Sequence, residues 1–456
     1  MNKSPLTWIP VIGLFLVCLG SAFGQATPAV PAPDERYKAD ILVIVAHPDD
    51  DTGVSTYLAK AVLDEGKRVA VIFTNRGNSG PNAVGMEQSK SLADVREMEA
   101  RRSLATLGIT NVWFLRGQDT PTQDVLHSLE TLGHGEALEE TVRLIRLTRP
   151  EVVLTWMPAY VAGENHGDHQ ASGVVAVEGF DLAGNVTAFP AQLTAPRWHG
   201  GIGNYGEGLQ PWQPKKLYFF SDASHPEFLK GHGPTYLASD ISRTKKVSFS
   251  DINRALWKDY ATQIDFGDKV LSYYINMPEY LVLGKSLIPA ETEADVWAGV
   301  GNKPIAYVPP PQYQETPRTG ITLELGGPWA FYREFYRAHG LGSMKNLVPP
   351  QSALGESNQL WVPLLLRNDT PAAANITVSA DVPAGWSGIK RDGIYHLEPN
   401  SVYPIQVFLT APPVSNQNSA PTQSAPQMLT WTATKDGAEV GKAGLSVSME
   451  FNGVPQ

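Results

Sequence analysis

The sequence of 456 residues contains a single cysteine, Cys18, which lies in an apolar stretch near the amino terminus. Disulfide bonds and thiolate metal sites are therefore excluded from the rest of the chain, so any metal ion must be held by His nitrogens and carboxylate oxygens. The chain also lacks a run of basic residues, and its net charge is −10. We do not expect an acidic chain of this kind to bind nucleic acid.

Long apolar runs are absent beyond the first residues of the chain. There, Lys3 precedes an apolar stretch from Trp8 to Leu19 and small residues up to Gly24, a pattern typical of an export signal. We predict a signal peptide over residues 1–24, which implies a periplasmic or extracellular protein. A membrane anchor is the alternative, but the stretch is shorter than the roughly 20 residues that span a bilayer. We expect no transmembrane span in the mature chain.

The remaining sequence divides into three parts. Over residues 37–265, short Val/Ile/Leu runs alternate with helical patterns, which predicts an α/β domain with a Rossmann-like, mostly parallel sheet and helices on both faces. Residues 266–348 follow no regular pattern and are expected to form an irregular extension or linker. Residues 349–456 contain short alternating strands, which predicts an antiparallel β-sandwich. The strands expected in the α/β sheet are 41–46, 69–74, 112–115, 152–156 and 217–220.

The first predicted strand does not end in a Gly-x-Gly-x-x-Gly loop, which disfavours a nucleotide-binding domain. It ends in Ala46-His47-Pro48-Asp49-Asp50, and a second cluster, His166-Gly167-Asp168-His169, follows the strand expected at 152–156. Ligands of open α/β sheets bind outside the carboxyl ends of the strands. We therefore expect the two clusters to meet at that edge of the sheet.

These residue types suit a hydrolytic metal site. A catalytic zinc ion takes three ligands from His and carboxylate side chains and keeps a fourth position open for water. His47, Asp50 and one of His166 or His169 can supply the ligands. Asp49 would then lie beside the metal-bound water as a general base, while the remaining histidine donates to the oxyanion or the leaving amine. Together these parts describe hydrolysis of an amide or ester.

Each cluster also has a simpler interpretation. Asp49 and Asp50 belong to a residue type that caps helix N-termini. Two histidines in a Gly-containing loop are often ordinary surface residues. We favour a metal site because both clusters follow strands of one predicted sheet.

The segment 46–50 together with His166-x-x-His169 resembles the signature of the PIG-L/LmbE-like family of zinc-dependent de-N-acetylases, which act on N-acetylglucosaminyl-phosphatidylinositol and mycothiol-pathway sugars. The resemblance covers roughly residues 37–222. It implies zinc bound by His47, Asp50 and His169, with Asp49 as general base and His166 as the acid or electrophilic partner. Two His and one Asp also suit iron, cobalt or manganese, so another divalent transition metal stays open. Further similar segments are 73–80, 96–99, 107–109 and 214–218.

Three residues are candidates for substrate contact. Family members use the arginine that matches Arg96 to hold substrate hydroxyls or phosphate; the alternative is a salt bridge with Glu99, one turn along the helix. Asn75 and Arg76, at the tip of the second strand, are expected to line the same crevice or else to form a turn. The chain departs from the family at Asp51, where many members have Glu.

The carboxy-terminal segment around Val382-Pro383-Ala384-Gly385-Trp386 is similar to the NEW3-type sandwiches appended to secreted glycan-active proteins. The leading hypothesis is an exported zinc amidase that removes the acetyl group from an N-acetylglucosamine-type sugar or glycoconjugate. The competing hypothesis is a secreted carbohydrate-binding protein in which the metal site is structural or vestigial. The pattern makes no prediction of the oligomeric state.

Overall fold

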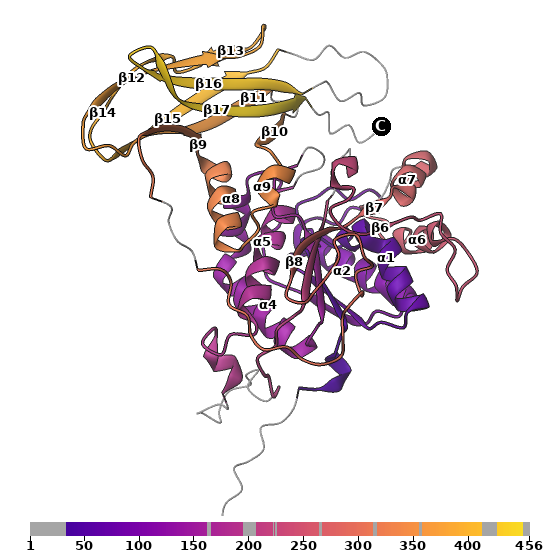
Figure 1. The fold of residues 1–456 in the computed structure, drawn as a ribbon. Helices are drawn as coiled ribbons and strands as arrows, with labels where there is room; N and C mark the ends of the chain where they lie inside the picture. The colour runs from indigo at the N-terminus through magenta and orange to yellow at the C-terminus, as the bar shows by residue number, and fades with distance from the viewer. Residues whose placement is uncertain are drawn as a thin grey trace, which may run out of the picture.

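The computed structural model describes residues 33–161, 166–194, 207–221, 223, 226–263, 267–312, 317–354, 358–412 and 426–449. The predicted signal peptide and Cys18 lie outside these residues. Among the helices that are described, none is long and apolar enough to cross a membrane. Figure 1 shows an α/β domain in indigo and magenta with a β-sandwich in orange and yellow above it.

The α/β domain is built on a six-stranded sheet in the order β3-β2-β1-β4-β5-β8. Strands β1 to β5 are parallel, and β8 pairs antiparallel with β5. The predicted fold class is confirmed, and the five predicted strands lie within one residue of their observed bounds. The order reverses between β1 and β4, so their carboxyl ends flank the switch point at which α/β domains bind ligands. The strands are β1 (Ile41–Val45), β2 (Val69–Phe73), β3 (Asn111–Phe114), β4 (Val152–Trp156), β5 (Lys216–Phe220) and β8 (Val282–Ser286).

Helices cover both faces of this sheet because alternate strand residues point to opposite sides. Leu42 and Ile44 of β1 pack in one core with α3, α4, α5 and α8, whereas Val43 and Val45 pack in another with α1, α2 and α6. The helices are α1 (Ser55–Ala59), α2 (Ser89–Thr106), α3 (Val125–Leu132), α4 (His134–Thr148), α5 (Gly167–Leu182), α6 (Phe249–Trp257), α7 (Gly267–Asn276), α8 (Gly327–Ala338) and α9 (Met344–Leu347).

Shorter elements complete the domain. The helical segment after β1 consists of three consecutive pieces and stops before Gly66, whose φ of 65° is left-handed. These pieces are η2 (Asp50–Val54), α1 and the π-helical η3 (Lys60–Asp64); the other short elements are η1 (Glu35–Tyr37), η4 (Pro190–Leu193), η6 (Pro226–Leu229), β6 (Thr235–Tyr236) and β7 (Glu279–Tyr280).

The segment 266–348, expected to be irregular, contributes a strand to each domain. β8 forms the edge of the α/β sheet, and β9 (Ile321–Leu325) pairs with β11 of the sandwich. The sequence does not predict β8, because Gly284 and Lys285 interrupt its apolar run. Gly284 is needed there, since a Cβ at that position would lie 2.4 Å from the Phe219 ring.

The sandwich consists of two sheets in the orders β10-β17-β16-β12-β14 and β13-β15-β11-β9, packed around a core of its own. Its strands pair antiparallel, apart from β10, which pairs parallel with β17. The predicted sandwich architecture is therefore present, while its likeness to NEW3-type domains stays a prediction. The strands are β10 (Gln351–Leu354), β11 (Gln359–Asn368), β12 (Ala374–Asp381), β13 (Ser387–Ile389), β14 (Gly393–Leu397), β15 (Ser401–Thr410), β16 (Gln427–Lys435) and β17 (Ala438–Met449).

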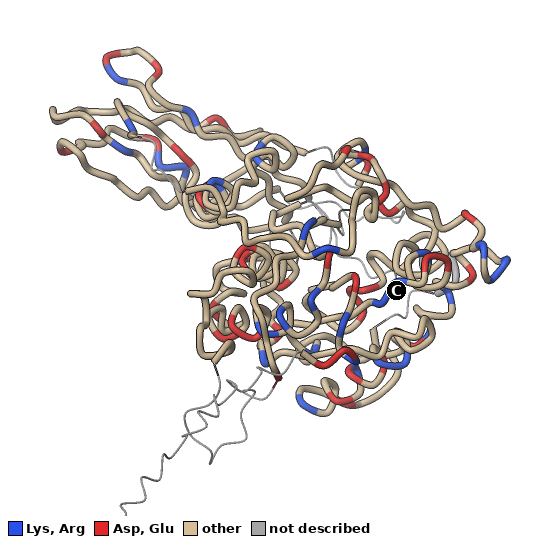
Figure 2. The backbone as a smooth tube through the Cα atoms, turned by 60° about the horizontal axis from the view of Figure 1, so that its bottom comes forward, with Lys and Arg blue, Asp and Glu red and all other residues tan. Residues whose placement is uncertain are grey.

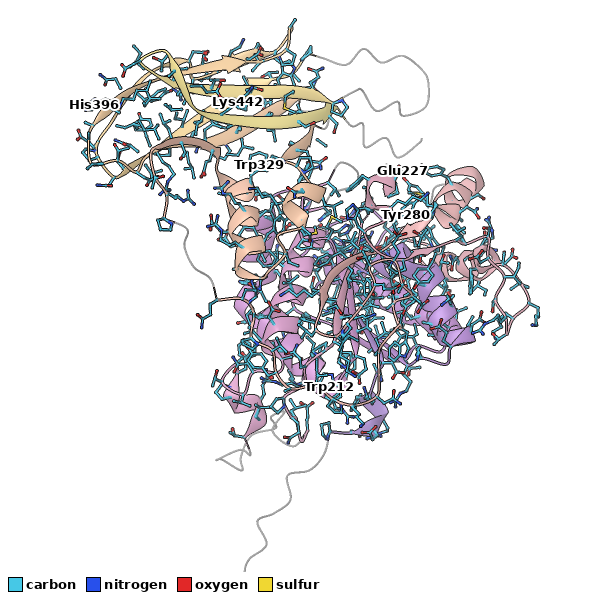
Figure 3. The ribbon with its side chains drawn as sticks, viewed as in Figure 1. Trp212, Glu227, Tyr280, Trp329, His396 and Lys442 are labelled. Carbon is cyan, nitrogen blue, oxygen red and sulfur yellow. The ribbon has the colours of Figure 1, made fainter. Side chains whose placement is uncertain are left out.

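Helix α8 joins the two domains. Tyr332 and Tyr336 on this helix are buried in the core of the α/β domain. At the start of the helix, Trp329 lies at the junction (Figure 3), where its Nε1 donates to the carbonyl of Gln351, 3.3 Å away. The sandwich is thus attached to the α/β domain through packed side chains as well as through the chain itself.

Charged residues of both signs are interspersed along both domains (Figure 2). One group of them reinforces the junction. Arg318 bridges Glu324 of β9 and Glu334 of α8 at 3.0 and 3.1 Å, and Arg333 of α8 reaches back to Glu324 at 3.2 Å. These ion pairs fix the angle at which α8 leaves the sandwich.

Candidate metal centre

The carboxyl ends of β1 and β4 bring the two predicted clusters together. His47 follows β1 by one residue, and Asp50 opens the helical turn η2. His169 lies in the first turn of α5, so the second cluster begins a helix and is not a surface loop. The donor atoms of His47, Asp50 and His169 all lie within 4.8 Å of one another, and all three residues are buried.

Asp50 is held so that one of its oxygens is left for another partner. Its Oδ2 accepts hydrogen bonds from the backbone N–H groups of Ala46 and His47, at 2.8 and 2.9 Å, and from Trp156 Nε1 at 2.6 Å. Its Oδ1 faces His169 Nε2 at 3.2 Å and His47 Nδ1 at 3.6 Å. Although burial alone would raise it, these two imidazoles hold the pKa of Asp50 well below its ordinary value.

The three donor atoms have the spacing of a tetrahedral metal site. His47 Nδ1 lies 3.0 Å from His169 Nε2, which completes a triangle with Asp50 Oδ1. Ligand atoms at bond lengths of about 2.1 Å around a tetrahedral zinc ion lie roughly 3.4 Å apart. Two His nitrogens and one carboxylate oxygen also form a common ligand set of catalytic zinc. The residues present therefore fit a divalent metal ion, and their role as its ligands stays a prediction.

The second nitrogen of His47 faces two carboxylates. Its Nε2 lies 3.3 Å from Asp119 Oδ1 and 3.5 Å from Asp168 Oδ2. A carboxylate on this side favours a proton on Nε2 and leaves the Nδ1 lone pair for a metal. Burial alone would lower the pKa of His47, but Asp50, Asp119 and Asp168 raise it well above its ordinary value.

His47, Asp119, His166 and Asp168 form a second group whose donor atoms lie within 4.8 Å of one another. Asp168, however, already accepts four hydrogen bonds, which satisfy both of its oxygens. They come from Asn75 Nδ2 at 3.1 Å, Thr120 N at 3.1 Å, Thr120 Oγ1 at 3.1 Å and Ser128 Oγ at 2.5 Å. The first group fits a metal better, and Asp168 and Asp119 fit the role of orienting His47.

His166 lies beside the triangle of candidate ligands, and its imidazole ring is neutral, so that it can donate one hydrogen bond. Burial, together with the charges of His47 and His169, lowers its pKa to about 3. Its Nδ1 accepts a hydrogen bond from the backbone N–H of Asp168, 3.2 Å away, and so caps α5. In a neutral ring with Nδ1 as acceptor the proton is on Nε2. That N–H is then available to an oxygen in the crevice.

Asp49 lies between two candidate ligands in a strained conformation. Its φ is 139°, in the region that glycine favours, and its side chain makes no capping hydrogen bond to the turn that follows. The helix-capping interpretation therefore does not account for Asp49. Strained non-glycine residues persist where the surroundings enforce them, and they cluster at functional sites.

The three predicted substrate residues all make hydrogen bonds or ion pairs within the protein. Asn75 is buried and holds both Asp168 and the backbone N–H of Gly77. Arg76 pairs with Asp94 and Glu97 on α2, at 2.6 and 2.8 Å. These contacts do not test a substrate role for either residue.

Arg96 on α2 is also buried. It donates to the carbonyl of Gly77 and, at 2.7 Å, to that of Pro81, and so holds this loop. The salt bridge with Glu99 is not formed: Glu99 instead accepts from Thr262 N and Oγ1 at 2.9 and 2.6 Å.

Asp51, the departure from the family pattern, belongs to neither group of possible metal ligands among the described residues. It is buried and accepts a hydrogen bond from the hydroxyl of Tyr260. Burial raises its pKa to about 7, against the opposing effect of this hydrogen bond. Asp51 thus ties the turn after β1 to the segment that follows α6.

Two residues near the centre were not predicted from the sequence. Asp119 lies beyond β3 in a loop without a motif, and Trp156 was assigned only to the strand that it ends. The available signal was positional, because both lie at the carboxyl edge of the sheet, where side chains from several strands converge.

Fold and cluster together define a Rossmann-like α/β domain with a candidate His–Asp metal centre at the switch point of its sheet. Residues 42–179 match the family model described as PIG-L: GlcNAc-PI de-N-acetylase. This part of the chain is thus similar to the family that its motifs resemble.

Relatives with known names are similar to the same region. A 1D-myo-inositol 2-acetamido-2-deoxy-alpha-D-glucopyranoside deacetylase 1 from Catenulispora acidiphila is 25% identical over 211 residues, which cover 43% of this chain and 58% of the relative. A deacetylase of the same substrate from Thermobifida fusca is 25% identical over 193 residues, covering 39% and 60% of the two chains. The chain thus spans about three fifths of the length of these relatives. A solved structure of an N,N'-diacetylchitobiose deacetylase from Pyrococcus horikoshii aligns with a TM-score of 0.37 and 17% identity, covering 52% of this chain and 76% of that chain.

Proposed function

We propose that the protein is a zinc-dependent hydrolase that removes the N-acetyl group from an N-acetylglucosamine-type sugar or glycoconjugate. The observation that carries the proposal is the buried triangle of His47, Asp50 and His169, which lies within the region that matches the PIG-L family. The names of the relatives, which describe deacetylation of a 2-acetamido-2-deoxy sugar, support the amide as the bond cleaved.

The proposed chemistry divides between the metal and two side chains. When bound by the triangle, zinc would polarise the acetyl carbonyl and lower the pKa of water at its open position. Asp49 accepts the proton of the attacking water. His166, neutral and with its proton on Nε2, donates to the oxygen on which charge develops. The C–N bond breaks with transfer of a proton to the amine, and acetate and the free amino sugar leave.

We retain three residues as candidates for substrate contact: Arg96, Asn75 and Arg76. Arg96 holds the Gly77 and Pro81 carbonyls of the loop after β2. Burial lowers the pKa of Arg96, while the charges of Asp49 and Asp119 oppose this effect. We propose that Arg96 affects substrate binding mainly by holding this loop in position. A replacement by Lys, which cannot reach both carbonyls with a planar fork, should raise KM more than it lowers kcat.

The test combines metal analysis of the purified protein with an acetate-release screen over N-acetylated monosaccharides, chitooligosaccharides and glycoconjugates. We expect about one zinc per chain, acetate release that a chelator abolishes, and recovery on adding zinc. Asp50→Ala should bind no metal and release no acetate. Metal-free protein that binds N-acetylated glycans without releasing acetate would instead support the carbohydrate-binding hypothesis.

Export belongs to the same proposal, on the strength of the amino-terminal sequence alone. Residues 1–24 are proposed to be removed during secretion, so the mature chain would begin at Gln25. Amino-terminal sequencing of the protein recovered from cell fractions tests this, and an intact Met1 in the cytoplasmic fraction would contradict it.

A further inference from the structure

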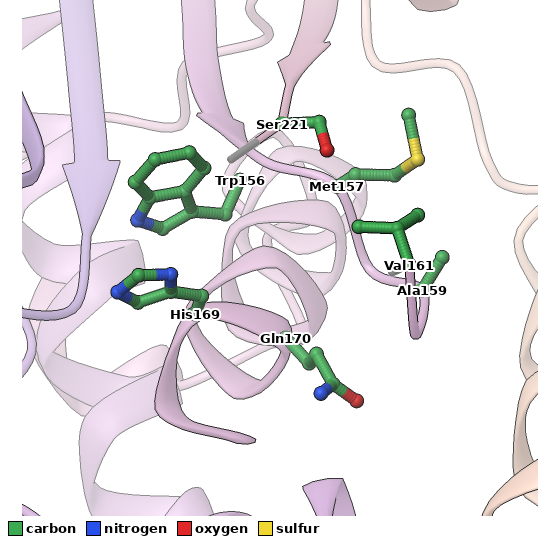
Figure 4. Close-up of a pocket in the computed structure, with 7 residues that line it drawn as sticks. All are labelled: Trp156, Met157, Ala159, Val161, His169, Gln170 and Ser221. Atoms are coloured by element: carbon green, nitrogen blue, oxygen red, sulfur yellow. The ribbon is translucent and has the colours of Figure 1, made fainter. Parts of the chain in front are cut away.

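Trp156 contacts two of the three candidate ligands at once. It ends β4, is 5% exposed, and donates its indole N–H to Asp50 Oδ2 at 2.6 Å. Its ring lies over the imidazole of His169, with ring centroids 4.5 Å apart and planes inclined by 10° (Figure 4). Asp50 and His169 come from different elements of the chain, and this indole bridges them.

The indole itself is fixed by its surroundings. Phe220 of β5 packs on it with ring centroids 4.3 Å apart. Near its edge lies Gly53, where a Cβ would be 3.0 Å from Trp156 Cη2 and 3.1 Å from Phe220 Cε2. The ring therefore has little freedom to move without moving a ligand.

The contact to Asp50 decides which carboxylate oxygen can bind a metal. Oδ2 already accepts from two backbone N–H groups, and the indole supplies its third donor. An oxygen with three donors is poorly available to a cation, so Oδ1 is the one left facing His47 and His169. On the other ligand, stacking sets the plane of the His169 ring and thus the direction of its Nε2 lone pair.

Trp156 is not placed to hold a substrate. The cavity beside it has a volume of about 10 Å³, room for roughly one water molecule. The cavity is lined by Trp156, Met157, Ala159, Val161, His169, Gln170 and Ser221. No sugar ring or acyl chain fits there.

We infer that Trp156 is a positioning residue of the metal centre, which sets the geometry of Asp50 and His169 before a metal arrives. The inference rests on the proposed metal site but not on the identity of the substrate. Partners that orient metal ligands typically contribute 10–100-fold to metal affinity.

The test measures metal affinity of the full mature chain with Co²⁺ and Zn²⁺ by chelator competition, alongside the visible spectrum of the Co²⁺ form. Trp156→Phe keeps an aromatic ring and removes the N–H, so we expect affinity to fall about 10–100-fold and the spectrum to change. Gly53→Ala keeps the indole and displaces its ring, and should weaken binding in the same direction. The matched control is Trp257→Phe, because Trp257 is buried in the same core, has no hydrogen-bond partner for its Nε1 among the described residues, and touches no candidate ligand. It should bind metal like the wild type.

Unchanged affinity and an unchanged Co²⁺ spectrum in Trp156→Phe would overturn the inference. If circular dichroism shows that Trp156→Phe does not fold, two other measurements test the inference. One is the metal affinity of Gly53→Ala, and the other is the indole N–H resonance of Trp156 in the wild type, which should shift on adding Zn²⁺. A wild type that binds metal but releases no acetate refutes the proposed function and leaves this test intact. A wild type that binds no metal refutes both.

Discussion

His47 Nδ1 and His169 Nε2 lie 3.0 Å apart although 122 residues separate them in the chain. At this distance the two ring nitrogens share a hydrogen bond, in which the N–H of one ring donates to the lone pair of the other. The metal-free site thus holds a proton between the two nitrogens, and Asp50, Asp119 and Asp168 raise the pKa of His47 against the effect of burial. Metal and proton therefore compete for this site.

This competition predicts how metal binding depends on pH. A ligand histidine must be neutral, so binding releases a proton wherever His47 is protonated in the apoprotein. Because its pKa is raised, affinity should fall by about tenfold for each unit that the pH drops below that pKa. Titration of Zn²⁺ in buffers of different ionisation enthalpy measures the protons released. Binding that does not change between pH 8 and pH 6 would contradict the expected linkage.

Asp49 should show opposing effects on stability and activity. Asp49→Ala is expected to retain metal and to slow turnover by a factor on the order of 10² to 10⁴, the usual contribution of a positioned general base. Asp49→Gly should be equally slow but more stable than Asp49→Ala by about 1 kcal/mol, because glycine adopts a φ of 139° without strain. Urea unfolding of the two metal-free variants measures the difference. Full activity in either variant would remove Asp49 from the mechanism.

Tyr332 on α8 connects the sandwich side of the molecule with the helix that carries His169. Its buried hydroxyl donates to Oε1 of Gln170, the neighbour of His169, while Gln170 Nε2 donates to the carbonyl of Gln123 at 3.2 Å. Tyr332→Phe should lower the free energy of unfolding of the α/β domain by about 1–2 kcal/mol, since it removes a buried hydrogen bond. The exposed Tyr403, changed to Phe, is the control and should have no effect. Equal unfolding midpoints for both variants would contradict the expected link.

Asp64 at the end of η3 predicts a different pH dependence. It accepts from the N–H groups of Arg243 and Thr244, at 2.7 and 2.9 Å, and from the Ser242 hydroxyl at 2.7 Å. Burial alone would raise its pKa, but these donors hold the pKa of Asp64 well below its ordinary value. Its contribution to stability is therefore present above the unfolded pKa of about 3.9 and is lost as the pH falls towards the lower folded value.

Asp64→Asn should consequently be less stable than the wild type at pH 7, by about 1 kcal/mol for a half-buried group. The difference should shrink below about pH 4, where the Asp64 carboxylate of the unfolded chain begins to be protonated while that of the folded protein stays ionised. Urea unfolding at pH 7, 5 and 3 checks this. A difference that grows as the pH falls would mean that another group is responsible.

The sequence predicts those helices and strands whose hydrophobic pattern lies within the element itself. The apolar runs at β1 and β4 and the helical spacing over α2 stand out because strands buried on both faces and amphipathic helices leave strong signals. β8 is hidden because its pairing with β5 requires a glycine against Phe219 and places Lys285 beside Asp181. Its position depends on partners far away in the chain, which a local pattern does not contain.

The same distinction applies to the site. His47, Asp50 and His169 could be named because they occur in compact motifs that follow strands. Asp119 occurs alone, and its position opposite His47 Nε2 arises only when the ends of β1 and β3 are brought to one edge. For Arg96 the sequence does not reveal that carbonyls of its own chain accept from the guanidinium, because those contacts depend on the path of the loop after β2. Its substrate role stays a prediction.

The path of the chain between the domains has a consequence for dissection of the protein. From β8 the backbone enters the sandwich as β9, returns to the α/β domain as α8, and leaves it again for β10. A deletion that begins at residue 349 would remove β11, the strand with which β9 pairs. The unpaired edge of β9 would then be exposed, which favours aggregation. A deletion that begins before β9 would remove α8 from the face of the α/β domain. A single cut therefore cannot separate the α/β domain from the sandwich without removing from one of them a strand or helix that it packs against.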